Sequence, residues 1–177
     1  LEISGGTVDL LANSQTGANA LGAVTVAGGS LLASGRTLAN AGTLAATSFS
    51  FGYDNGAVAD SVVTAKLSGA SLTKVSPTRT LTLWNANTFT GTANVTAGSL
   101  ILSGPQGSID ASAGIVVSAA NLTLDNTGAG NSNLNRVANT VPVSLASGTL
   151  LFRGADPASS NSTALINSTE TIGTLTL

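Results

Sequence analysis

A short strand-like motif recurs along this sequence. It reads Gly or Ala, a small polar residue, Leu, any residue, an apolar residue, any residue, then Gly or Asn, and full copies occupy 29–35, 98–104, 120–126 and 148–154. Looser copies begin at Gly6, Gly42 and Gly173. The starting positions are 23 residues apart from 6 to 29, 22 from 98 to 120, 28 from 120 to 148 and 25 from 148 to 173, and the interval of 69 from 29 to 98 is three times 23. Such a period is typical of stacked supersecondary units, which makes it the strongest constraint on the fold.

Each copy predicts one β-strand followed by a turn. Two apolar residues stand two positions apart in the copies, which is the spacing of a strand that buries one face. Aligning the copies on their first residue gives the predicted core, which consists of Val8, Leu31, Leu100, Leu102, Leu122, Leu124, Leu150 and Phe152. The last residue of each copy is predicted to form a left-handed corner, because Gly and Asn reach positive φ at low cost. These corner residues are Gly35, Gly104, Asn126 and Gly154.

One strand per coil cannot bury its apolar face alone, so equivalent strands of successive coils are expected to stack about 4.8 Å apart. The predicted fold is therefore all-β, a right-handed parallel β-helix (β-solenoid) of about seven to eight coils that occupies residues 1–177 as one segment. The alignment also predicts one inward column that runs from Val8 and Leu31 through Leu100 and Leu122 to Leu175. Asp125 and Arg153 share an offset in neighbouring copies and are expected to lie on adjacent coils.

Three segments depart from the repeat. Phe49, Phe51 and Tyr53 alternate and are followed by Asn55-Gly56, which favours a hairpin excursion over 49–67. Residues rich in Gly and Asn predict loops at 126–139 and 156–163. Loops on one side of a solenoid are a common place for binding surfaces.

Composition supports a solenoid and argues against several classes of function. Charged residues make up only 8% of the chain and aromatic residues only 3%. Small and hydroxyl side chains are common among the other residues, and such side chains suit closely stacked ladders. With six basic residues and a net charge of −2, the chain offers no basic patch for nucleic acid. No apolar run approaches the length of a membrane-spanning segment.

The reactive side chains argue against catalysis. The chain has no His and no Cys, which excludes a Ser-His-Asp triad, a Cys nucleophile and a His-ligated zinc. Its eight acidic residues include no adjacent pair and no Asp-x-Asp, whereas glycoside cleavage needs two carboxyl groups roughly 5–9.5 Å apart. We therefore expect no catalytic residues, no cofactor and no metal site. A fragment of a polysaccharide lyase or hydrolase is the least favoured alternative.

A family resemblance follows from the segment 87–104. Asn87-Thr88-Phe89-Thr90-Gly91, then Val95 and Gly98-Ser99-Leu100, resembles the autotransporter-associated β-strand repeat, also called the passenger-associated transport repeat. The closing stretch 170–177 is similar to a strand often present in long proteins with this repeat. The resemblance implies export and an extended stalk outside a bacterial cell, and it leaves the export route open.

Outward-facing apolar residues suggest an assembly surface. The residue between the two inward positions is Leu32, Ile101 or Leu151 in three copies, and a stack of these would form an apolar stripe. The alternative is that neighbouring loops cover the stripe. Both ends of the sequence follow strand patterns, so we expect them to pair with adjoining coils of the same polypeptide or with a second copy, end to end and side by side.

These observations predict a non-catalytic structural segment of an extracellular or cell-surface protein, acting as a stalk, a sheath or a self-assembling filament. The alternative is an adhesin passenger that binds glycan or another surface through the 126–139 loop or the aromatic residues. Trp84 is expected to point outward, because Leu81 and Leu83 point inward. Asn-x-Ser/Thr sequons leave glycosylation open; they begin at Asn94, Asn121, Asn161 and Asn167.

Overall fold

The computed structural model describes residues 2–4, 6–9, 24–33, 37–38, 42–51, 60–109, 113–128, 131–155 and 168–177, and every regular element in them is a β-strand. The strands are β1 (Glu2–Ser4), β2 (Thr7–Asp9), β3 (Val24–Ala33), β4 (Thr37–Leu38), β5 (Leu44–Phe51), β6 (Ser61–Val63), β7 (Leu67–Lys74), β8 (Thr80–Leu83), β9 (Ala86–Phe89), β10 (Thr92–Val95), β11 (Gly98–Leu102), β12 (Ser108–Ile109), β13 (Gly114–Ser118), β14 (Ala120–Asp125), β15 (Val143–Ala146), β16 (Thr149–Arg153) and β17 (Leu175–Thr176).

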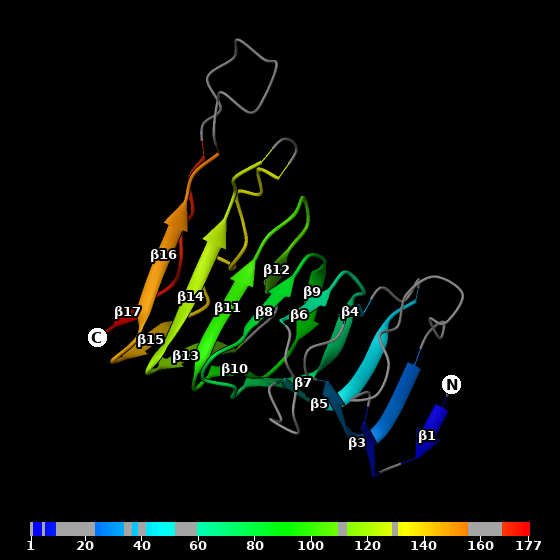
Figure 1. Cartoon of the computed structure of the whole chain (residues 1–177). Coiled ribbons are helices and arrows are strands. Elements are labelled where there is room, and N and C mark those ends of the chain that lie inside the picture. The colour runs from blue at the N-terminus through cyan, green and yellow to red at the C-terminus, as the bar shows by residue number, and fades with distance from the viewer. Residues whose placement is uncertain are drawn as a thin grey trace.

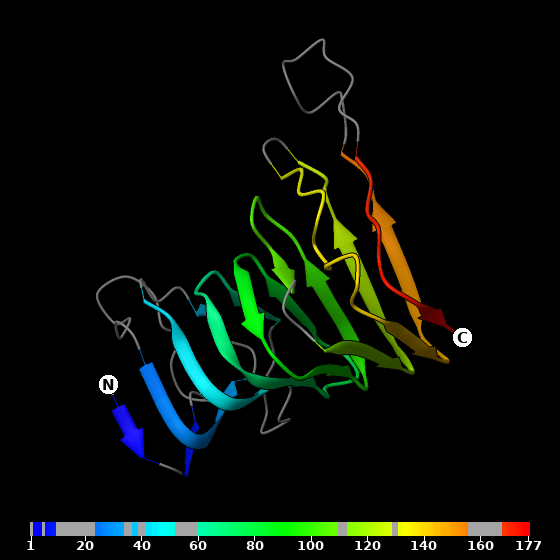
Figure 2. The ribbon, with the colours of Figure 1, turned by 180° about the vertical axis from the view of Figure 1, so that it is seen from behind.

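The strands build a parallel β-solenoid from two sheets that enclose one apolar interior (Figures 1 and 2). The large sheet follows the order β1-β3-β5-β7-β10-β13-β15-β17, with β2 paired to β3 and β9 paired to both β7 and β12. The small sheet follows the order β16-β14-β11-β8-β6-β4. Each described strand pair is parallel, as expected when a chain returns to the same face once per turn.

A closed turn is clearest in the middle of the stack. The chain passes through β8, β9 and β10, and then enters β11, which pairs in register with β8. About three turns are completed on all sides: β8 to β10, β11 to β13, and β14 to β15, where Val137 bridges Ile109. The expected seven to eight coils are not supported, because strand order alone does not count closed turns and several connecting segments lie outside the described residues.

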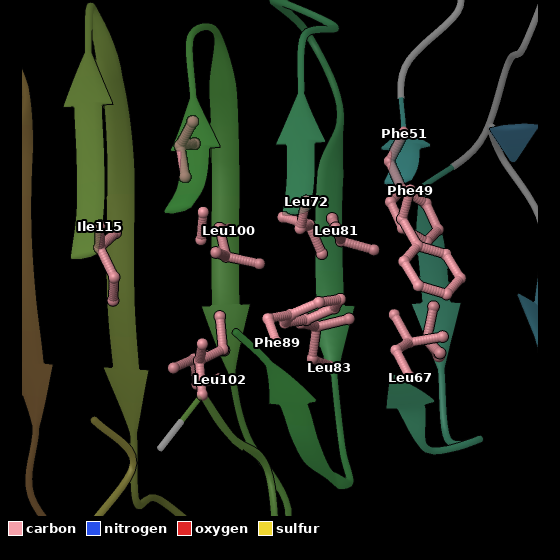
Figure 3. Packing of buried hydrophobic residues seen from close by; sticks show 14 of the residues in the cluster. Phe49, Phe51, Leu67, Leu72, Leu81, Leu83, Phe89, Leu100, Leu102 and Ile115 are labelled. Atoms are coloured by element: carbon pink, nitrogen blue, oxygen red, sulfur yellow. The ribbon is translucent and has the colours of Figure 1, made fainter. Parts of the chain in front are cut away.

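Leucine columns fill the interior behind the small sheet. Leu81, Leu100, Leu122 and Leu150 are successive register partners, and so are Leu83, Leu102, Leu124 and Phe152. Leu100, Leu102, Leu122 and Leu124 are buried, and Figure 3 shows the first two in the interior with Leu81 and Leu83. Leu150 is half-buried and Phe152 is 40% exposed, because β14 is the one strand beside β16 in the described part of this sheet.

The single inward column predicted from the repeat is wrong, because the motif copies fall on two different sheets. Val8 pairs with Leu31, and Leu31 pairs with Phe49, all within the large sheet. Leu175 also lies in the large sheet, opposite Val143, whereas Leu100 and Leu122 lie in the small one. The alternation of apolar and polar residues marks any strand with one buried face, so it does not distinguish the faces of a solenoid.

The aromatic residues of β5 belong to the core. Phe49 and Phe51 are almost completely buried, and the Phe49 ring meets the Phe89 ring edge to face at a centroid distance of 5.7 Å. These two residues therefore offer no exposed surface for a glycan. Residues 52–59, which include Tyr53, lie outside the described residues, so the hairpin excursion remains a prediction there, while β6 pairs in parallel with β4 and β8.

Two leucines of the small sheet test this packing. We expect Leu122→Ala to lower the free energy of unfolding by about 2–5 kcal/mol, because it leaves a cavity in a fully buried column. Leu151→Ala removes the same atoms from a side chain that is 41% exposed, and should cost about 0.5 kcal/mol. Denaturant titration of both variants measures the difference, and equal losses would contradict the assigned inward and outward faces.

Candidate functional site

One edge of the solenoid carries connections that grow longer along the stack. The chain leaves the small sheet through residues 84–85 after β8, through 103–107 after β11, and through 126–136 after β14. In Figures 1 and 2 these connections rise at the ends of the small-sheet strands. We call this side the corner edge. The shortest connection closes its turn with two residues, so closure alone does not require the long 126–136 loop.

A buried arginine fastens the long loop to the preceding corner. Arg136 is fully buried, and its Nη1 donates to the carbonyl of Gly107 at 2.7 Å while Nη2 donates to that of Gly104 at 2.9 Å. Within its own loop, Nε donates to Asn126 Oδ1 at 2.7 Å and Nη2 donates to the Asn131 carbonyl at 2.6 Å. One planar cation with fixed donor directions thus joins two successive corners.

The other side of the loop is held by the chain that follows β16. The Glu170 carboxylate accepts the backbone N–H of Arg136 at 3.1 Å and that of Val137 at 2.8 Å. Asn126 Nδ2 donates to Ser168 Oγ at 2.9 Å. We call Asn126, Arg136, Ser168 and Glu170 the polar clamp, which connects the 126–136 loop to both of its neighbours along the stack.

Burial of the Arg136 guanidinium has an electrostatic cost. Desolvation lowers the pKa of Arg136 from its ordinary value, and the negative charges of Asp125 and Glu170 oppose this shift. The side chain remains a cation at neutral pH, since guanidinium deprotonates only in strong base. A buried cation is tolerated when its donors are satisfied, and here four acceptors surround it.

The corner residues expected from the repeat play different roles. Gly104 has the predicted positive φ of 75°, but Asn126 and Gly154 are not among the described residues with positive φ, and Gly35 lies outside those residues. Asn126 is instead buried, and both ends of its amide are used in the polar clamp. Other left-handed residues stand where the chain enters the small sheet, at Gly98 (70°), Ala119 (50°) and Ser147 (58°).

Trp84 lies against Gly104 at the corner edge. A Cβ added to Gly104 would approach the indole ring to 3.0 Å, so the glycine lets the ring rest on the backbone of the next corner. The Trp84 side chain is 42% exposed, in agreement with its predicted outward direction. Pro105 and Gln106, which follow Gly104, are exposed as well.

The segment that carries the family resemblance has a structural role at the same edge. Asn87 is fully buried; its Oδ1 accepts the N–H of Leu67 at 2.9 Å, and its Nδ2 donates to the carbonyls of Asn85 and Ser108 at 2.7 and 3.2 Å. The Asn87 amide therefore joins three successive turns. At Gly91, a Cβ would lie 2.1 Å from the Ala70 carbonyl oxygen, so the close approach of two turns requires glycine.

The apolar stripe predicted for assembly is not continuous. Ile101 and Leu151 lie in one column of the small sheet, but Thr123 stands between them. Leu32 lies in the large sheet, opposite Ser50. Asp125 and Arg153 are register partners as expected, and no ion pair between them is seen in the described structure, where the Asp125 carboxylate accepts bonds from Thr127 instead.

Two other kinds of site are absent from the described ranges. They contain no group of three or more His, Cys, Asp or Glu residues placed to hold a metal ion. They also contain no helix long and apolar enough to cross a membrane. Comparison with protein-family models, with curated proteins and with solved structures gives no match for the chain.

Replacement of the clamp cation should weaken the corner edge. We expect Arg136→Met to lower the free energy of unfolding by about 2–4 kcal/mol, because buried acceptors lose their donors. Arg153→Met is the matched control; this arginine is exposed, and its removal should change stability by about 0.5 kcal/mol or less. Hydrogen exchange should also show faster exchange at the amides of residues 131–137 in the first variant alone. Unchanged exchange there would contradict the clamp.

Proposed function

We propose that this chain is a non-catalytic structural segment of a bacterial extracellular or cell-surface β-solenoid protein, acting as a stalk, a sheath or a self-assembling filament. The observation that carries the proposal is the open edge of the small sheet at β16. Phe152 is 40% exposed there, although its register partner Leu124 is 2% exposed. Among the described residues, the same inward position is thus covered on one side of the stack only.

The open edge favours pairing with a further coil. Leu151 and Phe152 expose apolar surface on β16, which has one neighbouring strand among the described residues. A further parallel strand would cover this surface and pair with the free backbone groups of β16. The partner would be an adjoining coil of the same polypeptide or a second copy of this chain. Right-handed coiling and a total of seven to eight coils belong to this proposal.

The nature of the faces also supports a structural role. Hydrogen bonds between turns run along the stack, and the described sheets present Ser, Thr and Asn in register, for example Thr80, Ser99 and Asn121 in one column. Such a stack resists extension because each turn is joined to the next over several strands. Kinship with the autotransporter-associated β-strand repeat, and with it export, is proposed from residues 87–104 on the resemblance described above.

Charges placed at the open edge test this function. We expect the purified chain to form end-to-end fibres at high concentration, visible by electron microscopy, and the double variant Leu151→Lys with Phe152→Lys to remain as single particles, because charge at an edge strand opposes pairing. Leu134→Lys is the matched control, since Leu134 is 54% exposed and lies on the 126–136 loop, outside the strands of the small sheet. Single particles of the unaltered chain at every concentration would rule out self-assembly and leave the stalk.

A further inference from the structure

The exposed tryptophan of the corner edge has a fixed orientation. Trp84 is the only Trp in the chain, it is 42% exposed, and its ring rests so close to Gly104 that a Cβ there would come within 3.0 Å of it. The backbone N–H of Trp84 donates to the Val63 carbonyl at 2.9 Å, which anchors the residue to the preceding turn. One side of the indole is therefore supported by the protein, while part of its surface faces solvent.

The polar clamp brings the long loop to the same corner. Arg136 Nη2 donates both to the Gly104 carbonyl and to the Asn131 carbonyl, so the residue that supports the Trp84 ring is tied to the 126–136 loop through one nitrogen. Trp84, Gly104 and Asn131 follow β8, β11 and β14, which are three successive strands of the small sheet. Three consecutive corners are thus joined in sequence, from the Trp84 ring to Gly104 and from Gly104 through Arg136 to Asn131.

A passive stalk does not need this arrangement. The corners at 84–85 and 103–107 close their turns without a long loop, yet the 126–136 loop is present and is held by a buried cation whose desolvation has a cost. A loop fixed in one conformation loses little entropy on binding, which favours recognition. The loop exposes Thr127, Leu134 and Asn135, and the neighbouring corners expose Thr64 and Gln106.

From this juxtaposition we propose that Trp84, with the 103–107 corner and the described residues of the clamped loop (126–128 and 131–136), forms a binding site for a neutral carbohydrate chain. A sugar ring has apolar C–H faces that pack on an indole, and hydroxyl groups that pair with amide and hydroxyl side chains such as those of Gln106 and Asn135. An anionic ligand fits poorly, since Arg136 is buried and its donors already serve carbonyl and amide oxygens. This role goes beyond the structural function proposed above and does not depend on it.

The single tryptophan makes the site directly testable. Titration of the chain with neutral cello-, chito- and manno-oligosaccharides should change the emission of Trp84 saturably for at least one of the three, and calorimetry should give the same dissociation constant. Trp84→Ala should weaken that binding about tenfold or more, and Trp84→Phe should weaken it less, because a smaller aromatic face remains. Phe152→Ala is the matched control, since Phe152 is exposed to a similar extent but lies on β16. This variant should bind the oligosaccharide as tightly as the unaltered chain does.

Four results would overturn the proposal. The first is no change in emission and no heat with any of the neutral oligosaccharides up to about 10 mM, and the second is binding of acidic polysaccharide alone. The third is equal affinity of the Trp84→Ala variant and the unaltered chain. The fourth is a loss of affinity in Phe152→Ala as large as that in Trp84→Ala. Circular dichroism of each variant confirms that its strands are intact, so that a loss of binding reports on the site.

Discussion

The parallel register between successive turns is the constraint on which the rest of this structure depends. Once β8, β11 and β14 pair in register, Leu81, Leu100 and Leu122 must stack in one column. The residues that alternate with these leucines along each strand must then face outward. Each turn buries the apolar face of its neighbour, so no turn in the middle of the stack is stable by itself. The same rule explains the exposure of Phe152 on β16, since strands of the described structure cover its inward position on one side only.

Buried polar side chains join the turns where the strands end. Asn87 and Arg136 each bond to backbone groups of other turns at the corner edge, and Lys74 Nζ donates to the carbonyls of Ser76 and Ala97 where the chain turns from the large sheet. The corners are places where backbone groups leave the ladders and need other partners. A stack with few charged residues thus places several of its polar groups inside, and they fix loop geometry. The same fixed geometry is used in both proposals, the structural role and the carbohydrate site at Trp84.

The repeat predicted more of the fold than of the surface. It gave an all-β parallel solenoid and the alignment of the copies that begin at 98, 120 and 148, because amphipathic strands with a constant period have few other ways to bury their apolar faces. It placed Leu31 and Leu32 beside residues of the wrong sheet, since alternation looks the same on each face. The clamp was missed because its partners, Asn126, Arg136 and Glu170, are far apart in sequence, and only the isolated Arg in a loop rich in Asn could have drawn attention to it.

The sequence by itself thus determined the class of fold, the inward direction of Leu100 and Leu122, and the outward direction of Trp84, since these follow from strand periodicity, which is local. Only the tertiary structure decided which sheet each copy joins, how the Arg136 charge is satisfied and what supports the Trp84 ring. Those outcomes depend on contacts between separate turns. Gly104 and Arg136, 32 positions apart, meet because the coil length and the length of the 126–136 loop together bring them to one corner.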